Sequence, residues 1–165
     1  MNYVITVDEA DQQTGIEEKL TAHQKGILHR AFSIFIFNDQ QEMLLQQRAL
    51  DKYHSGGLWT NACCSHPYPG EANADGAHRR LMEEMGFDCV LEYWKPFKYH
   101  AAVDNDLIEH EIDHLYTGTY NGAIAINPAE VHEYRYLSLQ EIRSWMDASP
   151  QAFTAWFKMI FPEFL

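Results

Sequence analysis

The sequence has 165 residues, about the length of one ordinary domain, and we predict a single domain over residues 1–165. Its composition, 46% hydrophobic and 22% charged, excludes a disordered chain and a collagen-like repeat. The 12 basic and 24 acidic residues give a formal net charge of -12, which argues against nucleic acid or an anionic membrane as the main partner.

The cysteines and the N-terminal segment favour a location in the cytoplasm. The three cysteines, two of them adjacent, are a poor basis for the disulfide framework of a secreted protein. Residues 1–8 contain no basic segment followed by a long apolar stretch, and a run of about 18 apolar residues occurs nowhere. We therefore expect a cytoplasmic protein that does not cross a membrane.

The first half of the chain predicts strands followed by a helix. The β-branched and aromatic run 31–37 and the segment 42–47 are typical of a hairpin, with turn residues Asn38 and Asp39 after the first strand. A short strand is expected over 58–64, before a loop over 65–70 of the kind that often carries chemistry. Apolar residues at helical spacing predict a helix over 73–85, with Gly86 as its C-terminal cap.

The second half predicts more strands and then helices. Strands are expected near 90–99, 111–120 and 133–137, and a second C-terminal helix after Pro150. Ser138 followed by Glu141 is the capping-box pattern that begins a helix. This order favours an α/β sandwich over a doubly wound parallel sheet. Because neither a G-x-G-x-x-G turn nor a P-loop occurs, we expect no flavin and no nucleotide cofactor.

Two short motifs could carry chemistry, and each has an ordinary alternative. Arg79 and Arg80 lie one helical turn before Glu83 and Glu84, as they also would on a salt-bridged surface helix. Cys64 lies two residues before His66. That spacing is compatible with a metal-binding pair, with a nucleophile beside a base, or with a simple buried thiol, which is the commoner case.

Acidic residues and histidines make a metal site a serious competitor to an ordinary solvated strand. In an extended chain Glu109, Glu111 and Asp113 project to one face, where like charges repel unless a cation or solvent separates them. A solvated edge strand is the alternative. Nine histidines are many for this length, and imidazole is the commonest transition-metal ligand. Individually we interpret the histidines as surface residues, including His54, His78, His100 and His132.

Residues 60–67 match T-N-x-C-C-S-H-P, and E-x-E follows downstream at Glu109 and Glu111, a combination far more specific than any single fragment. Together with the segments above, it closely resembles type 1 isopentenyl-diphosphate isomerase. The resemblance implies a Nudix-type α/β/α sandwich with a mixed sheet and additional C-terminal helices, its core over about 29–140. The matching segments, in the family's order, are Leu28-His29-Arg30-Ala31-Phe32-Ser33, Gln47-Arg48-Ala49-Leu50, residues 59–67 (WTNACCSHP), residues 79–86 and Glu109-His110-Glu111.

The helical segment matches the Nudix box, G-x5-E-x7-R-E-U-x-E-E-x-G-U, where U is bulky and apolar. Ser65 stands where the first glycine belongs, and Arg80 replaces the glutamate after the arginine. Nudix hydrolases usually hold divalent ions with several box glutamates. The change at Arg80 therefore weakens the alternative function, hydrolysis of a nucleoside or sugar diphosphate. The positions that fit are Glu71, Arg79, Leu81, Glu83, Glu84, Gly86 and Phe87.

The resemblance implies an isomerase that interconverts isopentenyl diphosphate and dimethylallyl diphosphate, in isoprenoid precursor biosynthesis. This metal-dependent 1,3-allylic shift adds a proton at one end of an unactivated alkene and removes another two carbons away, which requires groups on both sides of the substrate. By resemblance these groups are Cys64 on one side and Glu111, supported by Tyr99, on the other. Trp156 matches the aromatic residue that stabilises carbocation character.

The resemblance also implies two divalent ions. One, Mn²⁺, Mg²⁺ or Zn²⁺, would bind His23, His29, His66, Glu109 and Glu111. The other, Mg²⁺, would bind Glu84 and bridge to the diphosphate, with Arg48, Lys52 and Arg80 as matching basic positions. We expect a small C5 isoprenoid diphosphate as substrate, and a monomer or weak dimer. A non-enzymatic alternative is a domain that binds a metal or a partner without turnover.

Overall fold

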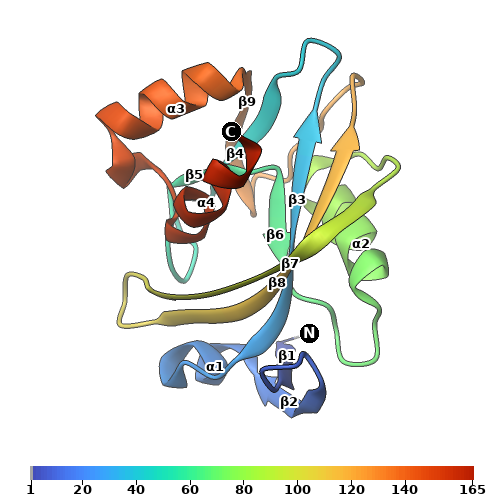
Figure 1. Ribbon diagram of the computed structural model, residues 1–165, viewed down its shortest axis with the longest axis vertical. Helices are drawn as coiled ribbons and strands as arrows, with labels where there is room; N and C mark the ends of the chain where they lie inside the picture. Colours follow the sequence, from blue (N-terminus) through green and yellow to red (C-terminus); the bar gives the residue numbers. More distant parts are fainter. Residues whose placement is uncertain (1) are drawn as a thin grey trace.

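The computed structural model describes residues 2–165 and contains one mixed sheet flanked by helices (Figure 1). The strands are β1 (Tyr3–Val7), β2 (Gln13–Glu18), β3 (His29–Phe37), β4 (Met43–Arg48), β5 (Trp59–Asn61), β6 (Cys63–Ser65), β7 (Glu92–Ala102), β8 (Ile108–Thr119) and β9 (Val131–Leu137). The helices are α1 (Lys19–Lys25), α2 (Asn73–Met85), α3 (Leu139–Ala148) and α4 (Ala155–Ile160), with 3-10 turns η1 (Pro150–Ala152) and η2 (Phe161–Phe164).

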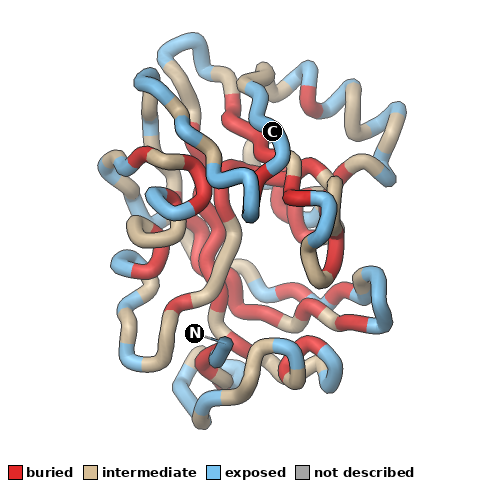
Figure 2. The backbone as a smooth tube through the Cα atoms, turned by 180° about the vertical axis from the view of Figure 1, so that it is seen from behind, coloured by how far each residue is buried: buried red, intermediate tan, exposed pale blue. Residues whose placement is uncertain are grey.

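Strand β3 is the centre of the sheet. It pairs antiparallel with β1, β4 and β6 and parallel with β8, where His29 lies opposite Glu111. Successive side chains of a strand point to opposite faces, so β3 supplies two cores. Phe32, Ile34 and Ile36 pack with α2 on one face, and Phe35 packs with α4 on the other. The buried residues follow these central strands (Figure 2).

Most predicted elements are confirmed, some with changed bounds. Helix α2 covers 73–85 as predicted, and Gly86 ends it in the left-handed conformation with φ 72°. Ser138 and Glu141 form both hydrogen bonds of the capping box at the start of α3. The single strand expected over 58–64 is two short strands, because β5 pairs with β4 whereas β6 pairs with β3. After Pro150 the chain first makes η1, and α4 begins only at Ala155.

The sequence analysis missed the N-terminal hairpin of β1 and β2 and the short helix α1. Strand β2 is polar and largely exposed, so it has little of the alternation that marks a half-buried strand. The hairpin is held through Ile5 and Val7, which pack against Ile112 of β8. Glu18 caps α1 by accepting hydrogen bonds from the amides of Leu20 and Thr21. This segment matters because it carries His23.

Two further properties of the described chain concern its cysteines and the length of its helices. All three cysteines, Cys63, Cys64 and Cys89, are free thiols. Within residues 2–165, every helix is too short or too polar to span a membrane.

Gly86 should be the most sensitive of the glycines with positive φ. An alanine there would have to keep a positive φ, and its Cβ would overlap the carbonyl oxygen of Ala125. We expect Gly86→Ala to lower the free energy of unfolding by about 2–4 kcal/mol, combining backbone strain with overpacking. Gly70→Ala is the matched control, since its φ is +81° but nothing lies within 4 Å of the added Cβ. Urea denaturation giving equal losses for both variants would contradict this account.

Candidate active site

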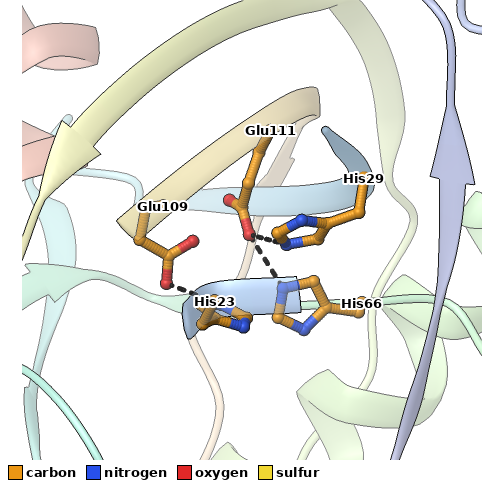
Figure 3. A group of neighbouring side chains, drawn as sticks. All are labelled: His23, His29, His66, Glu109 and Glu111. Carbon is orange, nitrogen blue, oxygen red and sulfur yellow. Dashed lines mark hydrogen bonds and ion pairs between the residues drawn. The ribbon is translucent and has the colours of Figure 1, made fainter. Parts of the chain in front are cut away.

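Three histidines and two glutamates converge at the end of the sheet near the N-terminal segment (Figure 3). One potential ligand atom from each lies within 4.8 Å of all the others. Nε2 of His29 and of His66 lie 2.9 Å and 2.8 Å from Oε2 of Glu111, and Nε2 of His23 lies 3.2 Å from Oε1 of Glu109. The set predicted by resemblance is thus brought together, and we call it the His/Glu group: His23, His29, His66, Glu109 and Glu111.

Each residue of the His/Glu group comes from a different local feature or register position. Glu109 and Glu111 are two residues apart on β8, so their side chains share a face, as predicted. His29 begins β3 opposite Glu111 in the parallel register. His66 follows β6 directly, and His23 lies on α1, which the N-terminal hairpin fixes against the sheet.

The hydrogen bonds behind the rings test whether a cation fits. Nδ1 of His23 lies 2.7 Å from the carbonyl oxygen of Lys19, and Nδ1 of His29 lies 2.8 Å from that of Ile27. Each Nδ1 must therefore carry a proton, which leaves Nε2 facing a carboxylate with a lone pair unless it is also protonated. In addition, Glu109 Oε2 is buried without a hydrogen-bond partner among the described residues. A divalent cation bound by nitrogen and oxygen ligands resolves both features.

The ionisation of the group follows from burial and mutual attraction. Burial alone would raise the pKa of Glu109, but the bond from His23 holds it well below its usual range. Burial opposes protonation of His29, yet Glu111 raises its pKa above the ordinary value. Burial lowers the pKa of His66 to about 4, although Glu111 opposes this. The carboxylates are therefore ionised and His66 is neutral, as metal ligands must be.

Cys64 lies on β6, on the other side of β3 from Glu111. Its Sγ lies 2.9 Å from Oδ1 of Asn61 and accepts the indole N–H of Trp156 at 3.2 Å. The Asn61 amide nitrogen donates to the carbonyls of Ile34 and Cys63, so its oxygen can only accept. Cys64 must then donate, and it is held as a neutral thiol.

The pKa of Cys64 agrees with this hydrogen bond. Burial, reinforced by the nearby Asp113 carboxyl, raises the pKa of the thiol to about 12. We therefore expect iodoacetamide to label Cys64 slowly, in a Cys89→Ser background, with a rate that still rises about tenfold per pH unit between pH 8 and 9.5, since only the thiolate reacts. A rate that reaches a plateau below pH 9 would contradict the assignment of a neutral thiol.

Tyr99 and Glu111 lie side by side on β7 and β8. They face each other in the β7–β8 register, and the Tyr99 hydroxyl donates to Oε1 of Glu111. Burial and the charge of Glu111 raise the pKa of Tyr99 well above its usual value, so the phenol stays protonated. Cys64, Tyr99, Glu111 and Trp156 line one cavity of about 290 Å³.

Part of the cavity lining is cationic although the protein is acidic overall. Arg48, Lys52 and Arg80, the three basic positions that the resemblance matched, all line the cavity. Arg80 contacts Glu84 at 2.5 Å, and this charge raises the pKa of the guanidinium despite burial. The predicted pairs of Arg79 with Glu83 and of Arg80 with Glu84 are both confirmed.

Several lining residues were not found from the sequence. Lys19 and Tyr53 both line the cavity, with Nζ of Lys19 4.9 Å from the centroid of the Tyr53 ring. Burial and the nearby charge of Lys52 lower the pKa of Lys19. Glu130 pairs with Lys52 and with Arg80. Lys19 lies in the N-terminal segment that was not predicted, and Glu130 lies in an ordinary polar loop. No local sequence pattern therefore marks either residue as part of the cavity.

One histidine interpretation was wrong. His100 and His132 are exposed, as predicted, and His78 is partly exposed. His54 instead is 1% exposed and lies 2.6 Å from Glu109. The loop between β4 and β5 turns it inward, which local sequence alone does not reveal.

Comparison with known proteins identifies the family. A model of the NUDIX domain matches residues 27–157. A Pectobacterium atrosepticum protein named isopentenyl-diphosphate Delta-isomerase is 53% identical over 158 residues, which is 96% of this chain and 88% of the relative. The chain belongs to this isomerase family, within the Nudix superfamily. A Burkholderia multivorans protein of the same name is 51% identical and covers 93% of this chain and 88% of its own length.

Solved structures agree on the fold. A Deinococcus radiodurans protein superposes with a TM-score of 0.74 at 14% identity, covering 88% of this chain and 89% of that one. The MutT protein of Methanosarcina mazei gives a TM-score of 0.69 at 20% identity, covering 83% and 92%. The predicted α/β Nudix fold and the predicted isomerase are thus confirmed, and the Nudix hydrolase alternative is not favoured.

Proposed function

We propose that this protein interconverts isopentenyl diphosphate and dimethylallyl diphosphate. Its relatives are named for isomerisation of isopentenyl diphosphate. The observation that carries the proposal is one cavity lined by a partly buried thiol and a buried carboxylate. These groups, Cys64 and Glu111, come from strands on either side of β3. A 1,3-allylic proton shift requires a proton donor and a proton acceptor in such an arrangement.

The basic end of the cavity would hold the diphosphate. Arg48, Lys52 and Arg80 supply charge-assisted hydrogen bonds there. We assign Glu84 to a Mg²⁺ ion and the His/Glu group to a second divalent ion, Mn²⁺, Mg²⁺ or Zn²⁺. Bound ions supply positive charge that offsets the diphosphate and fixes the carboxylates. The hydrocarbon end would then lie between Cys64 and Glu111.

The protein's residues then divide the reaction between them. One member of the Cys64 and Glu111 pair adds a proton to the terminal carbon of the alkene, which leaves a tertiary cation. The other member removes a proton two carbons away, so the double bond moves and no net proton is consumed. Tyr99 keeps the Glu111 carboxylate oriented through its hydroxyl. The π-face of Trp156, which is 3% exposed, stabilises the cation without offering a nucleophile.

Phosphorus and proton NMR of the protein incubated with isopentenyl diphosphate and Mg²⁺ or Mn²⁺ tests the function. We expect dimethylallyl diphosphate with the diphosphate intact. Release of phosphate or isopentenyl monophosphate would instead support a hydrolase. Unchanged substrate with Mg²⁺, Mn²⁺ and Zn²⁺ would support a binding domain without turnover.

The proposal extends to partners, location and oligomeric state. A small anionic molecule needs neither nucleic acid nor a membrane surface, and the net charge of -12 disfavours both. We propose that the protein acts in the cytoplasm as a monomer or weak dimer.

A further inference from the structure

His54 lies beside the His/Glu group without belonging to it. Its side chain is buried in the loop between β4 and β5, and its Nε2 lies 2.6 Å from Oε1 of Glu109. The ring also meets the edge of Trp156, with centroids 5.8 Å apart at 88°. His54 therefore stands between the metal-binding residues and the aromatic wall of the cavity.

The loop is built to bring this histidine inward. Ser55, the next residue, has a positive φ of 55°, and its amide donates to Oδ1 of Asp104 at 2.6 Å. Gly56 follows, where any Cβ would collide with the carbonyl oxygen of Leu50. The carbonyl of His54 itself accepts a hydrogen bond from Arg48 at 3.1 Å. Such constraints on both sides hold the His54 backbone in place.

The contacts of both ring nitrogens indicate the tautomer of His54. Nε2 lies 2.6 Å from a carboxylate oxygen of Glu109, which can only accept, so Nε2 carries the proton. Nδ1 lies 2.9 Å from Oγ of Ser55, whose hydroxyl can then donate to it. At the present angle neither Nε2 nor Glu109 Oε2 makes a hydrogen bond. If the Glu109 carboxylate rotates so that one oxygen binds an ion, its other oxygen can accept a hydrogen bond from the Nε2–H of His54.

We propose that His54 is a positioning residue for the metal site, an inference that rests on the proposed function of the His/Glu group. Its Nε2–H holds one oxygen of Glu109 while the other binds the ion. Metal-ligating carboxylates are in general hydrogen-bonded by such outer partners, whose loss weakens metal affinity. The ring of His54 contacts Glu109 but is not among the five mutually close ligands.

Titration of the metal-stripped protein with Mn²⁺, followed by the electron paramagnetic resonance signal of free Mn²⁺, tests this inference. We expect His54→Phe, which keeps an aromatic ring but removes the N–H, to weaken binding about 10–100-fold. His54→Gln, which keeps a donor, should recover part of this loss. His132→Phe, at an exposed position on β9, should bind as the wild type does. Circular dichroism checks that each variant is folded.

Two results would overturn the role of His54, and a third concerns the site itself. Wild-type Mn²⁺ affinity in a folded His54→Phe variant would show that Glu109 needs no such support. Loss of one imidazole coupling from the bound Mn²⁺ in His54→Gln would make His54 a direct ligand instead. If the wild type binds neither Mn²⁺, Mg²⁺ nor Zn²⁺, the proposed metal site fails, and the role of His54 fails with it.

Discussion

Cys64→Ala should lower kcat for isomerisation by about 10²–10⁴-fold, the usual contribution of a positioned acid or base. The thiol is the group on its side of the cavity that can carry the transferred proton, since Asn61 and Trp156 only orient it. Removing Sγ leaves the basic residues at the diphosphate end in place. The KM for isopentenyl diphosphate should therefore change much less than kcat, measured by product NMR.

Cys89→Ala is the matched control for Cys64→Ala. Cys89 is also a partly buried free thiol, but it packs against the α2 core and does not line the cavity. We expect kcat within a factor of about 2 of wild type, as for most substitutions remote from a site. Cys64→Ala with nearly wild-type kcat would remove Cys64 from the mechanism and point to a different proton donor.

Glu111→Gln should have the largest effect of any single substitution, because this carboxylate has two roles. Its Oε1 accepts a hydrogen bond from the Tyr99 hydroxyl, and its Oε2 faces His29 and His66. The amide cannot act as a base and binds a divalent ion weakly. We expect kcat to fall by about 10⁴-fold or more and Mn²⁺ affinity to fall with it, measured by kinetics and by metal titration.

Asp113→Asn is the matched control for the metal-binding role of Glu111. Asp113 lies two residues further along the same face, is equally buried, and bonds to Ser33 at 2.6 Å instead of a histidine. Mn²⁺ affinity should therefore stay at the wild-type value in Asp113→Asn while it falls in Glu111→Gln. Equal affinity losses in both variants would indicate a general electrostatic effect of the strand, and would contradict coordination by Glu111.

The sequence predicted the central elements because they have strong local patterns. The α2 segment has apolar residues at helical spacing and a C-terminal glycine, and β3 contains a β-branched and aromatic run that ends at turn residues. Alternation along β8 correctly placed Glu109, Glu111 and Asp113 on one face, all of them buried. These features depend only on neighbours in the chain.

The assembly of the site depends on tertiary contacts that no local pattern contains. The parallel register that sets His29 beside Glu111 joins residues 82 positions apart, and Trp156 reaches Cys64 across 92 positions. The family resemblance supplied this grouping, whereas residue patterns alone left metal, nucleophile and core alternatives open. His54 was misjudged because a positive φ at Ser55 and the packing of Gly56 turn it inward.

The central claim is that one proton is added and another removed on opposite sides of a bound C5 diphosphate. Incubating the metal-loaded protein with isopentenyl diphosphate in deuterated water, and following the product by NMR, tests it most directly. The account predicts dimethylallyl diphosphate that carries solvent deuterium, with the label absent from reactions of Cys64→Ala and Glu111→Gln. Dimethylallyl diphosphate formed without deuterium would contradict the proton addition and elimination proposed for Cys64 and Glu111.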